Sequence, residues 1–281
     1  MARMCREKVY SVKKIDSPKY GRYAKRRFGQ NFLQDANIIR KIVEALEIEP
    51  DDKVIEIGPG HGALSKKIAE YSPALYAAVE FDIDLALELR DKCPSIQPLA
   101  ADALTIQWEK LRAGSGNWKL IGNLPYNVAS PLMWEILSRA TAVSHAVFMI
   151  QKEVGQRIIA EPGSRTYGAL SVWLQSFAQP EYLFTVSPNV FVPRPKVHSA
   201  VLRFTPQNEK IDFEPAALSG LLKKCFQNRR KQLGKILKSC WNQHIPLWLE
   251  NEGLDSRVRP EDLTPKQFQA LSGLIKTDFM A

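Results

Sequence analysis

The sequence is poor in cysteine and histidine and has no long apolar run, and each shortage excludes a class of protein. Its four cysteines share no C-x-x-C spacing, which argues against a zinc ribbon or a disulfide framework and fits a reducing cytosol. The four histidines have no metal-ligand spacing, so we expect no metal site. No stretch approaches about 18 consecutive apolar residues, so we expect no membrane-spanning helix. The basic N-terminus is not followed by an apolar block, so we expect no secretory signal.

The remaining composition is that of an ordinary globular protein. The chain has 281 residues, of which 45% are hydrophobic and 25% are charged. These values exclude collagen-like, low-complexity and wholly disordered chains. The apolar content suffices for a core that needs no disulfides. The length fits one large domain or, better, two domains of unequal size.

Positive charge is concentrated at the N-terminus. Residues 1–27 contain ten lysines and arginines against two acidic residues, and so carry +8 of the chain's net charge of +9. A basic arm on a nearly neutral body suits a polyanionic partner, because each neutralised phosphate releases counterions. A solvated tail that keeps the protein soluble, or part of a transit peptide, explains the arm equally well.

A second basic cluster favours nucleic acid as the partner. Arg229, Arg230 and Lys231 are adjacent, and four more lysines lie close to them in the sequence. Two separate clusters in a protein of this size are hard to attribute to solubility alone. We therefore expect Arg26 and Arg27, at the end of the basic stretch 1–27, together with the residue 229–231 cluster, to bind RNA.

Strands and helices alternate through the first half of the chain. Asp35 can cap a helix that runs to about Leu46, a second helix begins at Ala63, and Asp82 or Asp84 can start a third. The predicted strands are residues 53–57, 74–79, 96–99, 119–121 and 147–150. Such alternation is typical of a doubly wound parallel sheet.

The pattern changes after the last of these strands. Strand-like runs at 182–186 and 197–204 flank a proline-rich loop and predict an antiparallel pair that completes the sheet. From about Gln207 the chain is helical, with apolar stripes at 218–226 and 233–240 that meet at a basic corner. The predicted regions are a basic arm (1–24), an α/β domain (25–206) and an all-helical domain (207–281).

A glycine loop marks a candidate nucleotide site. Gly58, Gly60 and Gly62 lie between a predicted strand and a helix, where glycines let the backbone approach a ligand. Their G-x-G-x-G spacing is not the G-x-G-x-x-G that seats a pyrophosphate. Glu80 ends the next strand, where a carboxylate can accept hydrogen bonds from both hydroxyls of a ribose. NAD and S-adenosylmethionine both offer that ribose, and glycines that only pack a helix against a strand remain an alternative.

Asp102 follows the third predicted strand. A carboxylate there can accept a hydrogen bond from the exocyclic amine of an adenine ring. It can equally cap the segment from Ala103 to Ile106, so its position alone leaves both roles open.

The tetrapeptide Asn123-Leu124-Pro125-Tyr126 at the end of the fourth strand is the most informative feature. The exocyclic amine of a nucleobase is a poor nucleophile, because its lone pair is delocalised into the ring. Two acceptors, the Asn123 Oδ1 and a carbonyl of the Leu124-Pro125 unit held rigid by the proline, can bind the two N–H groups and aim the lone pair at a methyl donor. Tyr126 can stack on the base. The alternative, a plain Asn-x-Pro turn, leaves the neighbouring glycine loop unexplained.

The stretch from Phe191 to Ser199 has prolines at two alternate positions, which stiffen an extended loop. Taken alone, Phe191 reads as a core residue. Together with Tyr126, it becomes a candidate second stacking plate for a flipped base. Arg194 and Lys196 would then lie near a phosphate backbone.

These motifs together resemble the small-subunit (16S-class) ribosomal RNA adenine-N6,N6-dimethyltransferases, the KsgA family. The matching segments are residues 27–33 (RFGQNFL), 56–60 (EIGPG), 123–126 (NLPY), 151–154 (QKEV), 191–199 (FVPRPKVHS) and 226–231 (FQNRRK). The resemblance implies an α/β, Rossmann-like class I methyltransferase domain, with a mostly parallel seven-stranded sheet and an antiparallel end, plus a small all-α domain. It also implies transfer of methyl groups from S-adenosylmethionine to two adjacent adenines near the 3′ end of 16S rRNA.

The resemblance also assigns residues and surroundings. By match to the family pattern, the expected S-adenosylmethionine contacts are Asn31, Leu33, Gly58, Gly60, Glu80, Asp102 and Asn123. Asn123, Leu124, Pro125, Tyr126 and Phe191 are expected to hold the target adenine. The expected partner is a precursor of the small ribosomal subunit. We expect the protein to be a monomer and to act in the cytoplasm.

Three alternatives remain at this point. The related large-subunit rRNA methyltransferases share the chemistry, although the helical domain and the Phe191 loop favour the small-subunit group. A ribosome-assembly factor whose binding matters more than its chemistry is compatible with both basic clusters. A dehydrogenase is the least favoured alternative, because this sequence offers no residue that would handle a hydride and the reaction would not need residues 123–126.

Overall fold

A seven-stranded sheet forms the centre of the computed structural model, which describes residues 31–111, 117–207 and 212–275. In spatial order the strands are β4 (Gln97–Ala100), β3 (Leu75–Glu80), β2 (Lys53–Ile57), β5 (Trp118–Asn123), β6 (Val143–Gln151), β9 (Ser199–Pro206) and β7 (Ala178–Val186). The strands from β4 to β6 are parallel, and β9 runs antiparallel to both β6 and β7. The prediction of a parallel sheet with an antiparallel end is confirmed.

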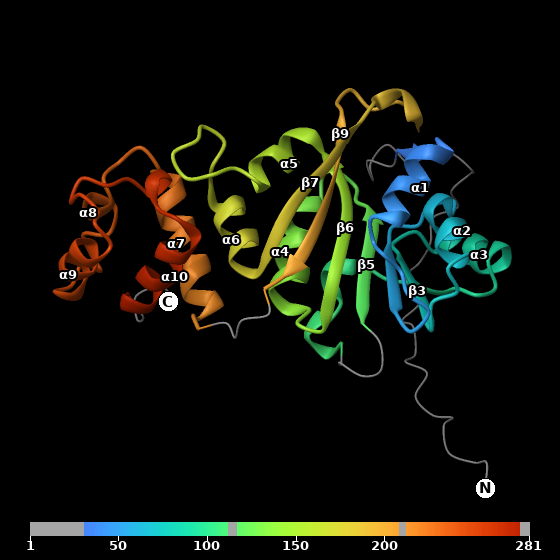
Figure 1. Ribbon diagram of the computed structural model, residues 1–281, viewed down its shortest axis with the longest axis horizontal. Helices are drawn as coiled ribbons and strands as arrows, with labels where there is room; N and C mark the ends of the chain where they lie inside the picture. Colours follow the sequence, from blue (N-terminus) through green and yellow to red (C-terminus); the bar gives the residue numbers. More distant parts are fainter. Residues whose placement is uncertain (1–30, 112–116, 208–211, 276–281) are drawn as a thin grey trace, which may run out of the picture.

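Helices cover both faces of the sheet (Figure 1). The helices on one side are α1 (Ala36–Glu44), α2 (Ala63–Ala69) and α3 (Ile83–Lys92), and those on the other are α4 (Ala129–Arg139), α5 (Lys152–Ile158) and α6 (Ala169–Phe177). Because successive side chains of a strand point to opposite faces, Val54 packs with the first group and Ile55 with the second. Central strands buried on both faces explain the nearly continuous apolar runs in the sequence.

Local capping fixes the starts of two helices as predicted. The Asp35 carboxylate accepts hydrogen bonds from the backbone N–H groups of Asn37 and Ile38 and so begins α1. Asp82, rather than Asp84, caps α3, since its Oδ1 accepts from the Asp84 N–H at 3.1 Å.

A two-stranded ladder joins segments that are far apart in the sequence. β1 (Phe32–Leu33) pairs antiparallel with β8 (Phe191–Val192), and Leu33 lies opposite Phe191. The Gln34 N–H extends the ladder by donating to the Val190 carbonyl at 2.9 Å. The ladder holds the segment around Phe32 against the carboxyl end of β5, where the Asn123 side chain contacts it.

After β9 the described residues form helices and no strand. These are α7 (Pro215–Gln227), α8 (Leu233–Ile236), α9 (His244–Asn251), the 3-10 turn η5 (Pro260–Asp262) and α10 (Pro265–Leu274). The apolar stripe predicted as one helix over 233–240 is a four-residue helix followed by a turn, in which the Cys240 N–H donates to the Leu237 carbonyl. Leu218 and Phe268 share a hydrophobic core with Phe177 of α6, so apolar packing crosses residue 206. The division into domains at this position stays a prediction.

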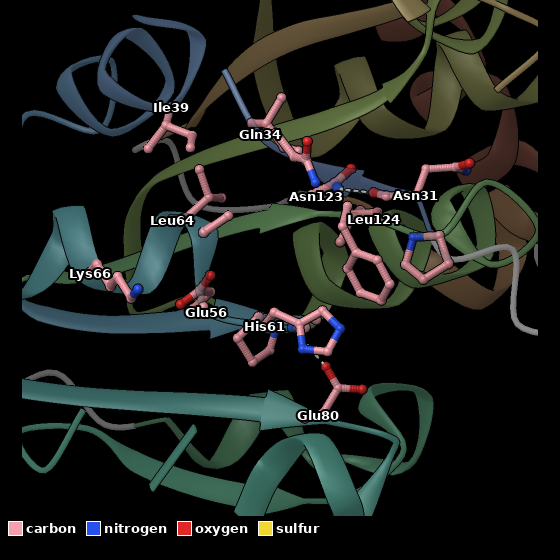
Figure 2. Close-up of a pocket in the computed structure, with 18 of the residues that line it drawn as sticks. Asn31, Gln34, Ile39, Glu56, His61, Leu64, Lys66, Glu80, Asn123 and Leu124 are labelled. Carbon is pink, nitrogen blue, oxygen red and sulfur yellow. Dashed lines mark hydrogen bonds between the residues drawn. The ribbon is translucent and has the colours of Figure 1, made fainter. Parts of the chain in front are cut away.

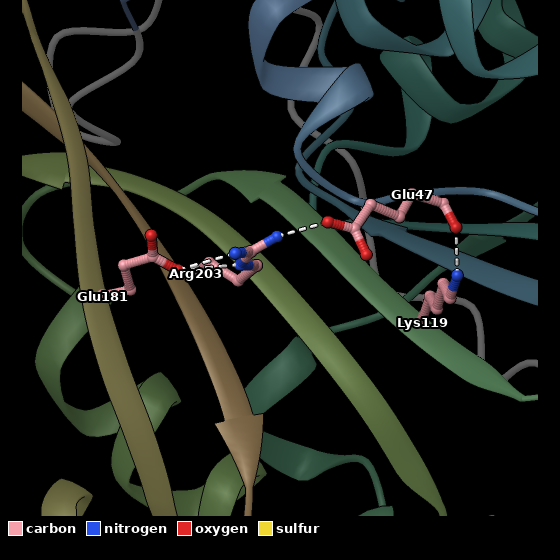
Figure 3. A network of polar contacts seen from close by, with 4 residues as sticks. All are labelled: Glu47, Lys119, Glu181 and Arg203. Atoms are coloured by element: carbon pink, nitrogen blue, oxygen red, sulfur yellow. Dashed lines mark hydrogen bonds and ion pairs between the residues drawn. The ribbon is translucent and has the colours of Figure 1, made fainter.

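A polar network that is buried at one end and exposed at the other lies toward the amino ends of the parallel strands (Figure 3). The Lys119 ammonium forms an ion pair with Asp52 at 2.7 Å, and both side chains are almost fully buried. Lys119 also donates to the Glu47 carbonyl oxygen. The Arg203 guanidinium bridges the carboxylates of Glu47 and Glu181 at 2.5 and 2.7 Å. The network ties the loop after α1 to β5, β9 and β7, at the edge opposite the carboxyl ends of the parallel strands.

No helix within the described ranges has both the length and the apolar character needed to cross a membrane.

Candidate active site

A cavity of about 430 Å³ opens at the carboxyl ends of β2 and β5 (Figure 2). This is the edge at which ligands of open α/β sheets bind. The cavity is lined by nine of the residues expected to bind the methyl donor or the adenine: Asn31, Leu33, Gly58, Gly60, Glu80, Asn123, Leu124, Pro125 and Tyr126. They come from four separate segments, so the fold assembles in one place what the motifs scatter along the chain.

The glycine loop after β2 has a backbone that other residues adopt only with strain. Gly58 and Gly60 have φ values of +67° and +56°. A Cβ atom at Gly60 would lie 2.9 Å from Cε1 of Phe32. The Gly60 N–H donates to Glu80 Oε2 at 3.0 Å, which joins the loop to the end of β3. The glycines thus permit both a tight turn and an open floor for the cavity.

Glu80 is a buried carboxylate at the end of β3, and both of its oxygens accept backbone hydrogen bonds. Oε2 accepts from Gly60 and Oε1 accepts from the Asp82 N–H, both at 3.0 Å. Burial raises the pKa of Glu80, and the backbone N–H groups of Asp82 and Gly60 partly oppose that rise. Carboxylate oxygens have further lone pairs, so an ionised Glu80 can accept hydrogen bonds from a ligand diol.

Asp102 lies beside this cavity rather than in it. Its Oδ1 accepts from the Leu104 N–H at 2.9 Å and begins the 3-10 turn η2 (Ala103–Thr105). Asp102 also lines an adjoining cavity of about 230 Å³, which shares Gly58 and Glu80 with the first one. The cap uses one oxygen, and the exposed Phe81 ring lines the same second cavity. The two roles considered for Asp102, capping a helix and binding an adenine amine, are therefore compatible.

The Asn123 carboxamide has a defined orientation. Its Nδ2 donates to the Asn31 carbonyl oxygen at 3.0 Å, which leaves Oδ1 as an acceptor. In the next residue, the Leu124 N–H donates to the Met149 carbonyl, whereas no donor in the described ranges reaches the Leu124 oxygen. The Pro125 oxygen accepts from the N–H groups of Val128 and Ala129. Of the two carbonyls considered from sequence, that of Leu124 is the available one.

Tyr126 is half-buried at the side of the cavity. Its hydroxyl lies 2.7 Å from Ser199 Oγ, which fixes the ring between β5 and β9. Burial raises the pKa of Tyr126, so the hydroxyl stays neutral at physiological pH. A neutral ring held in this way can present a face to a planar ligand.

Phe191 differs from the role expected of it. Its side chain is 2% exposed and packs in the core with Leu33, Ile42 and Val201. It does not line the cavity that contains Asn123. The pairing of β8 with β1 places the Phe191 side chain in the core. Because the ring has no polar atom that needs a hydrogen bond, its burial stabilises the fold. In this structure Phe191 is a core residue, which was the alternative that the proline-rich loop alone favoured.

Several residues in and around the cavity were given no role from sequence. Glu56, the first residue of the EIGPG motif, lines the cavity, together with Phe32, His61 and Lys66. Behind it, Ser65 Oγ and the Tyr76 hydroxyl both donate to Glu56 Oε2, at 2.6 and 2.5 Å. The available signal was a carboxylate among the apolar residues 54–57 of β2, since burying an unpaired carboxylate there is destabilising.

Glu56 gives the unliganded protein a pH-dependent stability. Burial raises the pKa of Glu56 to about 7, against the lowering effect of the bonds from Ser65 and Tyr76. Between the ordinary carboxyl range and pH 7 the folded state therefore binds more protons than the unfolded state, and stability falls as pH rises. The free energy of unfolding of Glu56→Gln, taken relative to the wild type at the same pH, should rise by up to about 3 kcal/mol from pH 5 to pH 8.

Urea denaturation at the two pH values measures this gain. Glu70→Gln, at the exposed position just after α2, is the matched control and should have the same effect on stability at both pH values. An equal effect of Glu56→Gln at pH 5 and pH 8 would contradict the assignment.

The residues expected to bind RNA lie in different surroundings. Arg194, Lys196, Arg230 and Lys231 are exposed. Arg229 is partly exposed and already has protein partners: its guanidinium donates to the Arg165 and Tyr167 carbonyls and lies 3.6 Å from the Glu261 carboxylate. The arm of residues 1–24, with Arg26 and Arg27, lies outside the described residues.

Comparisons with known proteins agree on one family. The family model described as "Ribosomal RNA adenine dimethylase" matches residues 21–277. A protein named "Ribosomal RNA small subunit methyltransferase A" from Oleidesulfovibrio alaskensis is 55% identical over 92% of this chain and 93% of its own length. One of the same name from Acinetobacter baylyi is 41% identical over 94% and 97%.

Solved structures resemble the fold. A dimethyladenosine transferase from Plasmodium falciparum matches with a TM-score of 0.70 at 23% identity, over 85% of this chain and 94% of the other. The 23S rRNA methyltransferase ErmE matches with a TM-score of 0.65 at 25% identity, over 88% and 100%. On the family match and the identity to curated relatives, the chain belongs to the ribosomal RNA adenine dimethylase family.

Proposed function

We propose that this protein transfers methyl groups from S-adenosylmethionine to the N6 amines of two adjacent adenosines near the 3′ end of 16S rRNA, giving N6,N6-dimethyladenosines. Its substrate is a precursor of the small ribosomal subunit, which the protein meets as a monomer in the cytoplasm. The observation that carries the proposal is the Asn123 side chain. Its Nδ2 donates to the Asn31 carbonyl, which leaves Oδ1 as an acceptor, and the carbonyl of the next residue, Leu124, is also available.

The cavity residues fit S-adenosylmethionine. Gly58 and Gly60 leave an open floor, and at Gly60 a Cβ would press on the Phe32 ring. The buried Glu80 carboxylate suits ribose hydroxyls, and Asp102 in the adjoining cavity suits an adenine amine. Asn31, Leu33 and Asn123 line the remaining wall. When bound, S-adenosylmethionine supplies an electrophilic methyl group on a positively charged sulfur.

The residues of the NLPY tetrapeptide would act on the adenine. Asn123 Oδ1 and the Leu124 carbonyl would accept the two N–H groups of N6, which localises the nitrogen lone pair and points it toward the cavity. Pro125 holds the turn rigid through its fixed φ. Tyr126 would stack on the base and fix its distance from the donor. No strong base is required, since the amine loses a proton to water after it is methylated.

The test is methyl incorporation into purified substrates. We expect transfer to immature small subunits, with dimethyladenosine at two adjacent positions by mass spectrometry. Transfer to large-subunit RNA instead would favour a second candidate function, methylation of 23S rRNA. This candidate rests on the similarity to the structure of the 23S rRNA methyltransferase ErmE. Absence of transfer to either RNA would refute the proposal.

We propose in addition that the protein takes part in small-subunit biogenesis by binding as well as by chemistry. Arg194, Lys196, Arg230 and Lys231 are exposed cations that suit a phosphate backbone. A variant that binds immature subunits but does not methylate them separates the two roles. If such a variant restores assembly in cells that lack the protein, binding alone suffices for assembly.

Removing two exposed charges should weaken RNA binding without affecting the chemistry. We expect Arg230→Ala/Lys231→Ala to lower the affinity for small-subunit RNA about tenfold. It should also reduce the slope of log affinity against log salt by about 1.5 to 2, because two phosphate contacts are lost. The rate at saturating RNA should stay unchanged, as the site lies on other elements.

Filter binding at several salt concentrations measures the slope. Arg90→Ala/Lys92→Ala on α3, across the sheet from α7, is the matched control. An unchanged slope in the first variant would show that residues 230 and 231 are only a solvated surface.

A further inference from the structure

A pair of hydroxyl groups links the NLPY tetrapeptide to the strand that follows the proline-rich loop, and the chemistry above does not use it. The Tyr126 hydroxyl lies 2.7 Å from Ser199 Oγ, and no other group in the described ranges bonds to either oxygen. Ser199 is fully buried, whereas Tyr126 is half-buried and lines the cavity. One hydroxyl of the pair therefore belongs to the core, and the other belongs to a ring that a substrate can reach.

The sheet anchors one hydroxyl of the pair and not the other. Ser199 begins β9 and is paired with Gln151 of β6 on one side and with Val186 of β7 on the other. Tyr126 lies in the turn between β5 and α4, outside any helix or strand. Because β6 lies between β5 and β9 (Figure 1), the tyrosine reaches across the end of β6 to its partner. The bond thus fixes a side chain of a turn to a strand that is paired on both sides.

The addition of two methyl groups to one amine makes different demands on the site at each transfer. In the first transfer the adenine N6 has two N–H groups, and both acceptors of the tetrapeptide, Asn123 Oδ1 and the Leu124 carbonyl, can hold it. The N6-methyl product has only one N–H group, so one of the two acceptors loses its donor and the base is held less firmly. Stacking on Tyr126 then contributes a larger share of the orientation that the reaction needs.

We propose that Ser199 is a positioning residue for the second methyl transfer. It holds the Tyr126 hydroxyl and so keeps the ring in one place, which returns the N6-methyladenine to the line of attack. The lone pair of N6 forms a bond to the methyl carbon while the carbon–sulfur bond breaks, its electron pair stays on the sulfur, and the last N6 proton goes to water. The inference rests on the proposed function, because it concerns the second step of the same reaction. It makes the dimethyl product depend on a buried residue that does not line the cavity.

The hydroxyl pair acts through geometry rather than through charge. Burial raises the pKa of Tyr126 against the lowering effect of its bond to Ser199, and the Glu153 carboxylate adds to the rise. The tyrosine is therefore neutral near pH 7, and its partner is a neutral hydroxyl. Removing the Ser199 hydroxyl leaves the charge of the site unchanged and releases only the ring.

Time courses of product formation test the proposal. Immature small subunits are incubated with excess enzyme and S-adenosylmethionine, and mass spectrometry of N6-methyladenosine and N6,N6-dimethyladenosine gives a rate for each transfer. For Ser199→Ala we expect the first transfer to slow less than about threefold and the second at least about tenfold, so that N6-methyladenosine accumulates. Tyr126→Phe keeps the ring and removes the other hydroxyl of the pair, and it should give the same result.

Combining the two substitutions separates positioning from a general structural defect. If Ser199 acts only through Tyr126, Ser199→Ala/Tyr126→Phe should slow the second transfer no more than either single substitution does. The binding of S-adenosylhomocysteine to Ser199→Ala should match that of the wild type, because Ser199 does not line the cavity. A structural defect would instead slow both transfers equally and weaken this binding.

The chain offers a matched control for each substitution. The Tyr182 hydroxyl lies 2.7 Å from Thr185 Oγ1 on β7, so Tyr182→Phe removes a similar hydroxyl pair from an exposed position. Ser176→Ala removes a buried serine hydroxyl that donates to the Val172 carbonyl within α6. Neither control should change the ratio of the two rates. Equal slowing of both transfers in Ser199→Ala, or wild-type rates for both, would overturn the inference alone. Absence of any methyl transfer by the wild-type protein would overturn the proposed function with it.

Discussion

Replacing Asn123 with alanine is expected to lower the rate of methyl transfer by about a thousandfold, the largest catalytic effect of any single substitution in this site. The substitution removes Oδ1, one of two acceptors that would localise the lone pair of the adenine N6. It also removes Nδ2, whose bond to the Asn31 carbonyl holds the wall of the cavity. Losing one preorganised polar group of this kind typically costs a factor of about 10² to 10³, and the second lost contact adds to it.

The rate is measured by single-turnover incorporation of labelled methyl groups into immature small subunits at saturating RNA. Asn251→Ala, at the exposed end of α9, is the matched control and should retain the wild-type rate. Binding of the nucleoside 5′-methylthioadenosine by Asn123→Ala to within about tenfold of the wild type would show that the cavity persists although its wall has lost one hydrogen bond. A variant that transfers methyl groups at more than about a tenth of the wild-type rate would remove Asn123 from the reaction.

The elements that position the site were predictable because their signals are local. The strand β2 and the glycines with positive φ that follow it are visible in residues 53–60 as an apolar run followed by glycines. The start of α1 is visible as its capping residue, Asp35. Parallel strands bring their carboxyl ends to one edge, so placing Glu80 and Asn123 at strand ends also brought them to one cavity. Local sequence was therefore sufficient to predict the site residues that follow parallel strands, because the sheet topology brings those strand ends together.

Long-range packing was not predictable in the same way. Phe191 lies in the core because β8 pairs with β1, a contact between segments about 160 residues apart that neither segment signals. Tyr76 reads as one more apolar residue of a strand until the register places it behind Glu56. Arg229 belongs to a basic run, yet its guanidinium donates to carbonyls of the loop before α6 and lies near the Glu261 carboxylate. In each case the side chain's role is set by a partner that only the fold supplies.

The buried Asp52–Lys119 pair at the other edge of the sheet gives the second large effect, this time on stability. We expect Lys119→Met to reduce the free energy of unfolding by about 3 to 5 kcal/mol at pH 7, because it leaves the Asp52 carboxylate buried without its cation. Burial raises the pKa of Asp52, but the hydrogen bonds from Lys119 and the Glu49 N–H and the Lys119 charge outweigh it, so the net shift is downward. The pair therefore stabilises the fold at neutral pH, and this contribution is lost as pH falls through the lowered pKa of Asp52.

Urea denaturation of a double-mutant cycle distinguishes the loss of the pair from the loss of one partner. Asp52→Asn/Lys119→Met should be clearly more stable than Lys119→Met alone, since the second substitution removes the uncompensated charge. The exposed Lys110→Met should change stability by less than about 0.5 kcal/mol. If the two single substitutions were additive in the double variant, Asp52 and Lys119 would not act as a pair. The network of Glu47, Arg203 and Glu181 would then be the connection that holds the loop after α1 to the sheet (Figure 3).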